Sequence, residues 1–424
     1  MIPMHWSRRL ALAAALTLTI PPLVAQSRDV SPAAPYWSGV RERFSGARAK
    51  ETVAVLDRHV RWPGNRGFDA SIVHIVERLE QAGYVSESRA TAASRLTYRV
   101  ERYPMAAPAW EPTGATLRIA GESEPVLRFE TNRNMLATNS FGTPTPVEAE
   151  LVDAGDGRPS TLDSLDVRGK IVLARTGVSR LFAEAVSKRG AVGVLAYALP
   201  AYLQPARNRT SIQFGSVPRD TLAQAWGILL SYAAHERLRA ALARGTTRVQ
   251  VTTAVHWTPN AVEQAVVAEI RGAHRPDERF VFSAHVQEPG ANDNASGVGA
   301  QVEMARVAAS MLQAGAIDPA RTITMLWGLE IRSTDRYITQ DTVRARGIRW
   351  GLSLDMVGED IAKTGGTFLI EKMPDPSAIW TRGQDRHSEV GRITDRRSRS
   401  SRRTTSMTSS CRGASNRRRR TDGS

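Results

Sequence analysis

The sequence contains almost no cysteine. Its 424 residues include a single one, Cys411, which lies close to the C-terminus. One cysteine excludes an intrachain disulfide, so the folded body must rely on a hydrophobic core. The sequence also lacks an internal repeat at a fixed period, so a repeat architecture is not expected. With 42% hydrophobic and 23% charged residues, the composition is that of a globular protein, and its length allows two or three domains.

Long apolar runs are missing beyond the N-terminus. There, Arg8 and Arg9 precede an apolar stretch at residues 10–20, and Ala25 closes the segment. A run this short, ending in a small residue, predicts a signal peptide over residues 1–25 and therefore an exported protein, periplasmic or secreted. Export without disulfides fits a bacterial source, with no membrane partner after cleavage. An uncut membrane anchor stays open as the alternative, because Leu23 is unfavourable near the cleavage point.

Acidic residues are too few to balance the basic ones, and the net charge is +15. Much of the excess lies in residues 391–424, which hold eleven arginines and two aspartates. This composition predicts a disordered basic tail that cannot help to build a core. A nucleic-acid-binding arm is one interpretation, but no aromatic residues alternate with the arginines, so we expect no nucleic-acid partner. We favour a shifted reading frame as the origin of this aperiodic Arg/Ser/Thr run.

Apolar spacing predicts alternating helices and strands. Residues 48–60 and 70–79 have apolar side chains three and four apart, as amphipathic helices do. Strands are expected at residues 96–119, 125–129, 169–174, 190–196, 261–270, 280–284, 322–327 and 352–356, and further helices at 181–189 and 297–309. The alternation indicates an α/β fold, in which residues 144–253 form a self-contained block.

Four residues with metal-binding side chains lie where predicted strands end. His285 follows a strand, Asp293 precedes a helix, and Glu330 and Asp355 lie at the ends of two further strands. In open α/β sheets, ligands bind at the carboxyl ends of the strands. Imidazole and carboxylate groups suit zinc, and a carboxylate can bridge two ions. The pattern therefore indicates a zinc site, with Asp293 as the natural bridging candidate.

Each of these residues also has a simpler interpretation. An aspartate before a helix is usually a cap, a glutamate after a strand is usually solvated, and a lone histidine at a strand end is more often hydrogen-bonded than metal-bound. Capping does not explain why successive strands each end in a ligand-type residue. The combination is therefore the evidence for a site.

The motifs around these residues resemble those of the M28 family of zinc exopeptidases. They are the loop Pro-Gly-Ala-Asn-Asp-Asn-Ala-Ser-Gly at 289–297, the segment Trp-Gly-Leu-Glu at 327–330 and the segment Leu-Asp-Met-Val-Gly at 354–358. The likeness covers about residues 36–390, and the loop is its specific part.

The resemblance implies a role for each candidate residue. His285 and Asp355 would bind one zinc ion, Glu330 would bind a second, and Asp293 would bridge both. A hydroxide between the two ions would attack the carbonyl carbon of a peptide. The implied substrate is a short peptide or a peptide terminus. Amino- or carboxypeptidase specificity and the oligomeric state stay open.

The resemblance also implies a fold. We expect a three-layer α/β/α peptidase domain with a mixed sheet, built from residues 32–143 and 254–390. The block at 144–253 resembles the β-rich protease-associated domain that some family members carry as an insertion.

Two departures from the family pattern concern the chemistry. In the family, two adjacent acids end the middle strand, the first as general base and the second as a metal ligand. Here these positions hold Leu329 and Glu330, so either the base is missing, or Glu330 is the catalytic base and a ligand is missing. The family's aspartate two residues after the first histidine is replaced by Gln287, which can orient the ring only as a neutral partner.

A third departure concerns the last zinc ligand, which in the family is a late histidine. The only histidine after Asp355 is His387, which comes early and in a polar context. We therefore do not expect His387 to bind zinc, and the last ligand is left without a candidate. An alternative function follows: a catalytically impaired or truncated relative that binds peptide or metal without turnover.

Overall fold

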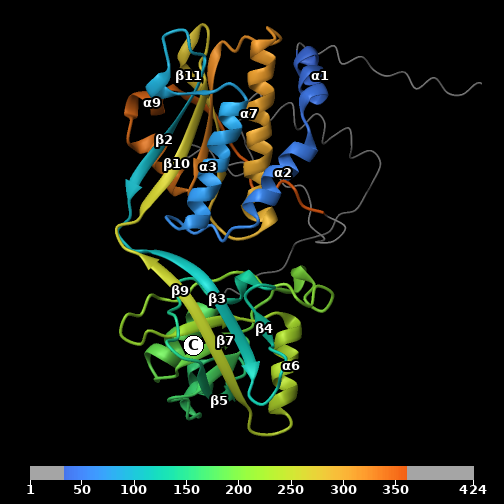
Figure 1. Cartoon of the computed structure of the whole chain (residues 1–424), viewed down its shortest axis with the longest axis vertical. Coiled ribbons are helices and arrows are strands. Elements are labelled where there is room, and N and C mark those ends of the chain that lie inside the picture. Colours follow the sequence, from blue (N-terminus) through green and yellow to red (C-terminus); the bar gives the residue numbers. More distant parts are fainter. Residues whose placement is uncertain (1–32, 361–424) are drawn as a thin grey trace, which may run out of the picture. The chain divides into compact units, whose positions relative to one another are not determined.

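The computed structural model describes residues 33–360 (Figure 1). The first of its two sheets has six strands in the order β1-β2-β10-β12-β11-β13. These strands are β1 (Val85–Ser86), β2 (Leu96–Pro104), β10 (Val262–Ile270), β11 (Arg275–His285), β12 (Arg321–Gly328) and β13 (Ile348–Ser353). The sheet is mixed, because β10 is antiparallel to both of its neighbours while β11 is parallel to β12 and β13.

Helices lie on both faces of this sheet. They are α1 (Ala34–Arg43), α2 (Gly46–Leu56), α3 (Arg66–Gln81), α7 (Gly297–Gln313), α8 (Arg332–Thr339) and α9 (Thr342–Gly347). Side-chain caps fix where two of them begin: Ser45 accepts a hydrogen bond from the backbone N–H of Arg48, and Asn65 accepts one from Phe68. Such caps satisfy donors that the first turn of a helix leaves unpaired.

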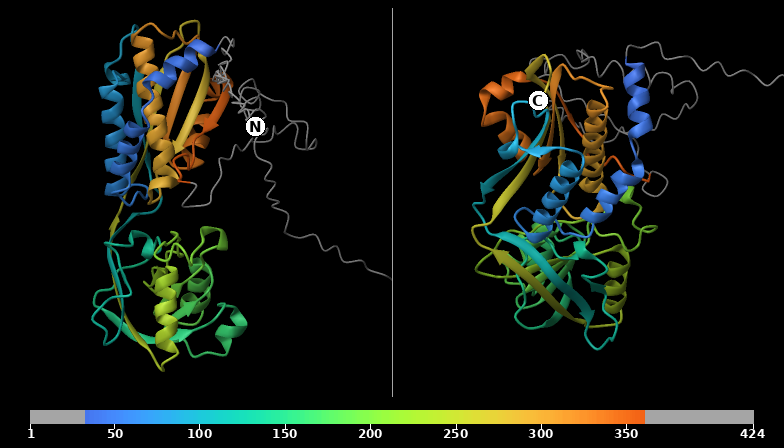
Figure 2. Two further views of the ribbon diagram at one scale, coloured as in Figure 1. Left: turned by 90° about the vertical axis from the view of Figure 1, so that its right-hand side faces the viewer. Right: turned by 45° about the horizontal axis from the view of Figure 1, so that its top comes forward.

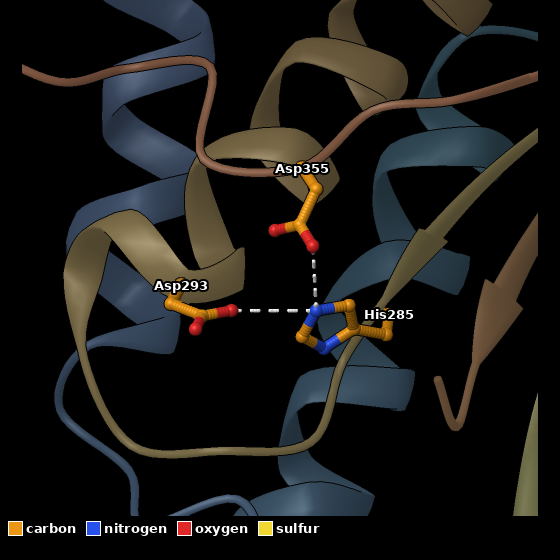
Figure 3. A group of neighbouring side chains, drawn as sticks. All are labelled: His285, Asp293 and Asp355. Carbon is orange, nitrogen blue, oxygen red and sulfur yellow. Dashed lines mark ion pairs between the residues drawn. The ribbon is translucent and has the colours of Figure 1, made fainter. Parts of the chain in front are cut away.

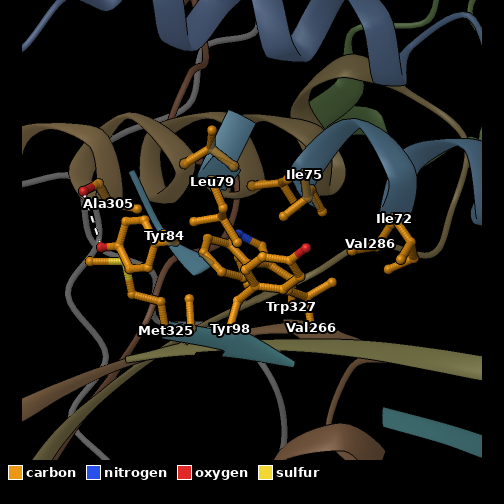
Figure 4. Packing of buried hydrophobic residues seen from close by; sticks show 14 of the residues in the cluster. Ile72, Ile75, Leu79, Tyr84, Tyr98, Val266, Val286, Ala305, Met325 and Trp327 are labelled. Atoms are coloured by element: carbon orange, nitrogen blue, oxygen red, sulfur yellow. Dashed lines mark hydrogen bonds between the residues drawn. The ribbon is translucent and has the colours of Figure 1, made fainter. Parts of the chain in front are cut away.

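The central strands divide their side chains between two cores. Val266 of β10 and Trp327 of β12 lie in the core under α3 and α7 (Figure 4). Their neighbours Val267 and Leu326 point the other way and pack against Tyr337 of α8. This period of two is what a strand requires when both faces are covered. The sheet and its two helical faces make three layers.

The amphipathic pattern of α3 explains its place in the first core. Its buried apolar residues recur three and four positions apart, at Phe68, Ile72, Ile75 and Leu79. Burying a side chain of this size contributes about 1.5–3 kcal/mol. Figure 4 shows Ile72, Ile75 and Leu79 directed at the sheet.

The second sheet has seven strands, in the order β4-β3-β9-β5-β6-β7-β8. They are β3 (Ala109–Ile119), β4 (Leu127–Arg128), β5 (Val147–Asp153), β6 (Ile171–Ala174), β7 (Gly193–Ala196), β8 (Trp226–Leu229) and β9 (Arg248–Thr258). Its helices are α4 (Pro159–Asp163), α5 (Val178–Leu181) and α6 (Tyr232–Leu242). Strands β5 to β8 run parallel, and β3, β4 and β9 form an antiparallel part. The long arrows of β3 (teal) and β9 (yellow) run in opposite directions in the right view of Figure 2.

The predicted mixed α/β fold is confirmed. The second sheet, however, includes β3 and β4, which come before residue 144, where the inserted block was expected to begin. The antiparallel pairing of β3 with β9 explains the difference, since it ties residues 109–119 to the end of the block. The assignment of this part as a protease-associated domain stays a prediction.

Two predicted elements differ in detail. The helix expected at 181–189 is realised as α5 followed by a wider π-type turn, Phe182–Ser187. The strand expected at 352–356 is displaced, because β13 pairs with β11 only as far as Ser353. Asp355 therefore follows the strand in a loop.

Several expectations concern residues outside the described range of 33–360. They are the signal peptide at 1–25, the basic tail at 391–424 and the role of His387. Within 33–360, none of the helices combines the length and the apolar character that crossing a bilayer needs.

Candidate metal centre

His285 is the last residue of β11, at the carboxyl end of the parallel part of the first sheet. The strand is paired on both sides, and His285 itself lies opposite Gly328 of β12. The next residue continues the link, because the N–H of Val286 donates to the carbonyl oxygen of Gly328. The imidazole is buried, with 6% of the side chain exposed. Its place is therefore fixed by the sheet.

Asp293 lies in the turn that joins β11 to α7. The turn, Ala291–Ser296, is wider than an α-helical turn. The side-chain oxygen of Asn294 accepts a hydrogen bond from the N–H of Gly297, at the start of α7. A Cβ atom on Gly297 would overlap the carbonyl oxygen of Leu354, so glycine is required where the helix begins. These contacts leave Asp293 facing His285.

Asp355 is held by the two polar residues on the C-terminal side of Asp293. The side-chain amide of Asn294 donates to the carbonyl oxygen of Leu354 at 2.8 Å and accepts from the N–H of Met356 at 3.2 Å. The hydroxyl of Ser296 accepts from the N–H of Val357 at 2.9 Å. Asn294 therefore binds the backbone on both sides of Asp355, and Ser296 binds it on the C-terminal side. The Asn-Asp-Asn-Ala-Ser motif positions two carboxylates, its own and that of the loop after β13.

His285, Asp293 and Asp355 form a compact group, which we call the metal cluster (Figure 3). The Nε2 atom of His285 lies 3.3 Å from Oδ1 of Asp293 and 3.4 Å from Oδ2 of Asp355. The other ring nitrogen, Nδ1, has no hydrogen-bond partner within the described part of the chain. Figure 3 shows Nε2 pointing between the two carboxylates.

The electrostatics of the cluster favour a cation. Burial opposes protonation of His285, but pairing with Asp293 and Asp355 outweighs it and raises the pKa of the imidazole to about 10. Two carboxylates around one nitrogen thus attract positive charge strongly. In the absence of a metal ion, a proton takes this place.

The donor set and its spacing fit zinc. Zinc binds imidazole nitrogen and carboxylate oxygen at about 2.0–2.2 Å, and two ligand atoms at tetrahedral angles then lie about 3.4 Å apart. The Nε2 to oxygen separations of 3.3 and 3.4 Å match this spacing. The three ligand atoms all lie within 4.8 Å of one another. His285, Asp293 and Asp355 are therefore close enough together to hold one ion.

Glu330, the fourth predicted ligand, lies outside the metal cluster. It follows β12 with an exposed side chain, and its backbone N–H donates to Oε1 of Gln287 at 2.7 Å. Gln287 therefore binds the turn after β12, and no hydrogen bond joins it to the ring of His285 among residues 33–360. Leu329 is buried in the core under α3 and α7, with 8% exposed. This side chain cannot accept a proton.

Sequence reasoning missed Arg61, whose side chain is hydrogen-bonded to the loop after β11. Its side chain is completely buried. The guanidinium donates to the carbonyl oxygens of Val286 at 2.8 Å and Gly290 at 2.9 Å, and also to that of Leu56 at 2.8 Å. Burial lowers the pKa of Arg61 to about 10, so the group stays charged at neutral pH. A lone arginine before a helix gave no signal in the sequence.

Glu288 was also missed, because it matches no family motif. Burial raises its pKa to about 7, and the carboxylate of Asp293 adds to the effect. His285 opposes this shift, while Glu330 adds to it. Glu288 is therefore an acidic group within electrostatic reach of three of the four predicted site residues.

The comparisons with known proteins agree with this geometry. Residues 265–399 match the family described as Peptidase family M28. A zinc aminopeptidase from Bacillus subtilis is similar in structure, with 19% identity, a TM-score of 0.50, and 74% of this chain and 70% of that chain covered. A Peptidase M28 precursor from Shewanella amazonensis has 16% identity and a TM-score of 0.54, with coverages of 75% and 73%. Identities this low establish the shared fold alone. The comparison with curated proteins gave no match.

Proposed function

We propose that this chain, a member of peptidase family M28 through its residues 265–399, is a zinc-dependent exopeptidase that acts on the amino terminus of peptides. One observation carries the proposal. The imidazole nitrogen of His285 faces the carboxylates of Asp293 and Asp355 at 3.3 and 3.4 Å, the spacing of zinc ligands. The aminopeptidase direction is taken from the B. subtilis protein with the similar fold.

The residues have distinct tasks in this proposal. His285 and Asp355 would hold one zinc ion, Glu330 would hold a second, and Asp293 would bind both. Two zinc ions, when bound, activate water as a nucleophile and polarise the peptide carbonyl. Asn294 keeps Asp293 and Asp355 at a fixed separation through its bonds to Leu354 and Met356. The chain's contribution is thus a rigid set of donors at the end of a sheet.

A second candidate function is supported by Leu329. The family's general base would stand at this position, and positioned acid-base catalysis is worth typically 10²- to 10⁴-fold in rate. Here the side chain is aliphatic and buried. A protein that binds zinc and a peptide but turns it over slowly, or not at all, is the function this observation favours.

Zinc content and peptide hydrolysis together separate the two functions. Zinc per chain is measured by elemental analysis after exhaustive dialysis, and hydrolysis is followed with one peptide in free, N-acetylated and C-amidated forms. An aminopeptidase cleaves the free and amidated peptides and spares the acetylated one. If the chain holds zinc but cleaves none of the three peptides, the result supports the second function, a protein that binds zinc and peptide without turnover. A chain that holds no zinc at saturating concentration contradicts both.

We also propose that the protein is exported. The proposal is supported by Arg8, Arg9 and the apolar stretch at residues 10–20. N-terminal sequencing of protein recovered from a bacterial periplasm tests it: cleavage after Ala25 is expected, and an intact Met1 on membrane-bound protein contradicts it.

A further inference from the structure

A cavity lies between three helices that cover one face of the first sheet. Helices α2, α3 and α7 pack against one another there (Figure 1). Each helix contributes an arginine to the lining, and α2 and α7 add further polar side chains. These lining residues are Arg48, Glu51 and Thr52 of α2, Arg78 of α3, and Glu303 and Arg306 of α7. None of them belongs to the metal cluster, so the cavity is a separate place for a ligand.

The size of the cavity limits what it can hold. Its volume is about 120 Å³. A water molecule takes roughly 30 Å³ in the liquid, so the space corresponds to about four waters. Pockets for drug-sized ligands measure about 300–1,000 Å³. The cavity therefore suits a small polyatomic ion, or one such group at the end of a larger molecule.

The charge of Arg306 is already balanced. The carboxylate of Glu303 accepts hydrogen bonds from Nε and Nη2 of Arg306 at 2.7 and 2.6 Å. It also accepts one from the backbone N–H of Ser45 at 2.8 Å. Both oxygens of this buried carboxylate are therefore occupied, and the pair adds no net charge to the cavity.

Arg48 and Arg78, in contrast, keep an unbalanced charge. Neither has an ion-pair partner among residues 33–360, and the guanidinium of Arg78 donates to the neutral side chain of Gln81 at 3.2 Å. Of the carboxylates that line the cavity, only Glu51 is left to oppose an anion. The excess of positive charge favours an anionic ligand, and guanidinium groups bind phosphate oxygens through paired N–H bonds.

A buried hydroxyl also lines the cavity. Thr52 is 2% exposed, and its Oγ1 lies 3.4 Å from Nε2 of His74. This is the one side-chain hydrogen bond that Thr52 makes within the described part of the chain. A hydroxyl can accept one hydrogen bond while it donates another. With a proton on Nε2 of His74, the hydroxyl proton of Thr52 is left for an acceptor in the cavity.

We propose that this cavity binds a phosphate group, with Arg48 and Arg78 as its cationic partners and the hydroxyl of Thr52 as a further donor. A phosphate group offers three acceptor oxygens and up to two negative charges at neutral pH. It therefore satisfies two guanidinium groups better than a carboxylate with two oxygens. Inorganic phosphate and a small phosphate ester share this chemistry. The bound group would join α2 to α3, and the inference does not depend on the zinc site.

Phosphate binding by the full chain tests the inference. Wild type, Arg78→Gln and Glu51→Gln are titrated with inorganic phosphate by calorimetry, with chloride adjusted to keep the ionic strength constant. Arg58→Gln removes the same charge as Arg78→Gln at an exposed position outside the cavity, so it is the matched control. A second titration uses glycerol 3-phosphate, which separates the two sources of the group.

We expect the two cavity variants to change the affinity in opposite directions. Arg78→Gln should weaken phosphate binding by about 10-fold or more, because it removes charge-assisted hydrogen bonds. Glu51→Gln should strengthen binding roughly 2- to 5-fold, because it removes a repelling charge at an exposed position. Arg58→Gln should bind phosphate as wild type does. A general change in stability would not produce opposite signs.

Other outcomes decide the inference and its source of phosphate. Equal affinities in wild type and Arg78→Gln overturn it and assign any binding to another place, such as the metal cluster. Competition by chloride at constant ionic strength overturns it as well, because a site for a phosphate group should not accept a single-atom anion equally. Tighter binding of glycerol 3-phosphate supports a site for esters, and tighter binding of inorganic phosphate supports a site for the free ion. A wild-type chain that binds neither overturns the inference and leaves the proposed peptidase function untouched.

Discussion

Arg61 and Val286 are joined by a hydrogen bond of 2.8 Å although 225 residues separate them in the chain. The bond links the segment after α2 to the loop that follows His285. It runs from a completely buried guanidinium to a backbone carbonyl. The loop that follows His285 is thus anchored by a residue that lies far in the sequence from all of the predicted ligands.

Replacing Arg61 should therefore destabilise the protein and weaken its metal site. Arg61→Met keeps the aliphatic bulk but leaves the carbonyl oxygens of Leu56, Val286 and Gly290 without this donor. The oxygen of Leu56 keeps the N–H of His59 as a donor, so two buried acceptors are left unsatisfied. At about 1–3 kcal/mol for each, we expect a loss of roughly 2 kcal/mol or more. Urea unfolding measures it. Arg58→Met, at an exposed position, should change the free energy of unfolding little. Equal effects of the two variants would show that the hydrogen bonds of Arg61 do not stabilise the loop.

Asp293 should be required for both zinc positions. Asp293→Ala removes the proposed bridge and the partner of His285 at 3.3 Å. Zinc per chain should fall to below one, measured by elemental analysis, while the circular dichroism spectrum stays that of the wild type. Asp335→Ala changes an exposed acid of α8 and should keep the full zinc content. Two tightly held ions in Asp293→Ala would rule out the bridging role.

Asn294 should affect zinc without binding it. Asn294→Ala removes the side-chain bonds to Leu354, Met356 and Gly297 and so frees the loop that carries Asp355. Supporting residues of this kind typically change metal affinity 10- to 100-fold, and we expect a loss in that range by zinc titration. Ser296→Ala removes one acceptor, that of Val357, and should have a smaller effect. An affinity unchanged in both variants would contradict this positioning role.

Restoring an acid at position 329 should raise turnover. Leu329→Glu places a proton acceptor where the family has its general base, which should increase kcat by roughly 10²-fold or more if the base is missing. Leu329→Gln has nearly the same shape and no comparable basicity, so it serves as the control. Steady-state kinetics on a free dipeptide distinguishes them. If the two variants give the same kcat, the missing base does not limit this enzyme.

The metal-free protein should lose stability as the pH rises. The pKa of Glu288 is raised to about 7 and that of His285 to about 10 in the fold. Both groups hold protons more tightly folded than unfolded, so their stabilising effect is complete at low pH. It is lost for Glu288 between about pH 4.5 and 7, and for His285 between about pH 6.5 and 10.

A comparison of variants isolates the Glu288 part of this effect. With a chelator present, the urea midpoint of wild type should fall relative to that of Glu288→Gln as the pH rises from about 4.5 to 7. A midpoint difference that stays constant over this range would show that Glu288 titrates normally.

The sequence predicted the parts of the fold that follow from local pattern. Apolar spacing located α3 and α7, and apolar runs located β6, β10 and β12 within a few residues. The extent of the second sheet was not predictable in this way. It depends on the pairing of β3 with β9, residues about 140 positions apart in the chain, and single-sequence patterns carry no information on such long-range pairs.

The sequence predicted those residues of the site that belong to recognisable motifs. The metal cluster brings together His285, Asp293 and Asp355, whose residue types and strand-end positions were visible in the sequence. Arg61 and Glu288 were not found, because their contribution depends on a buried position and a positive φ, and neither shows in the residue type. Glu330 lies nearby without joining the cluster, so its role depends on the proposed second ion.

The register of β2 against β10 has a consequence for how the chain folds. Pro104 pairs with Val262, so the two strands form a hairpin whose connection is residues 105–261. A flexible connection of this length would oppose pairing by its entropy. Within it, however, β3 and β9 bring Ala109 opposite Thr258. Once the second sheet has folded, only a few residues remain to be ordered on each side. The second sheet thus brings the ends of β2 and β10 together, as a tight turn does in an ordinary hairpin, and we expect the second sheet to fold first.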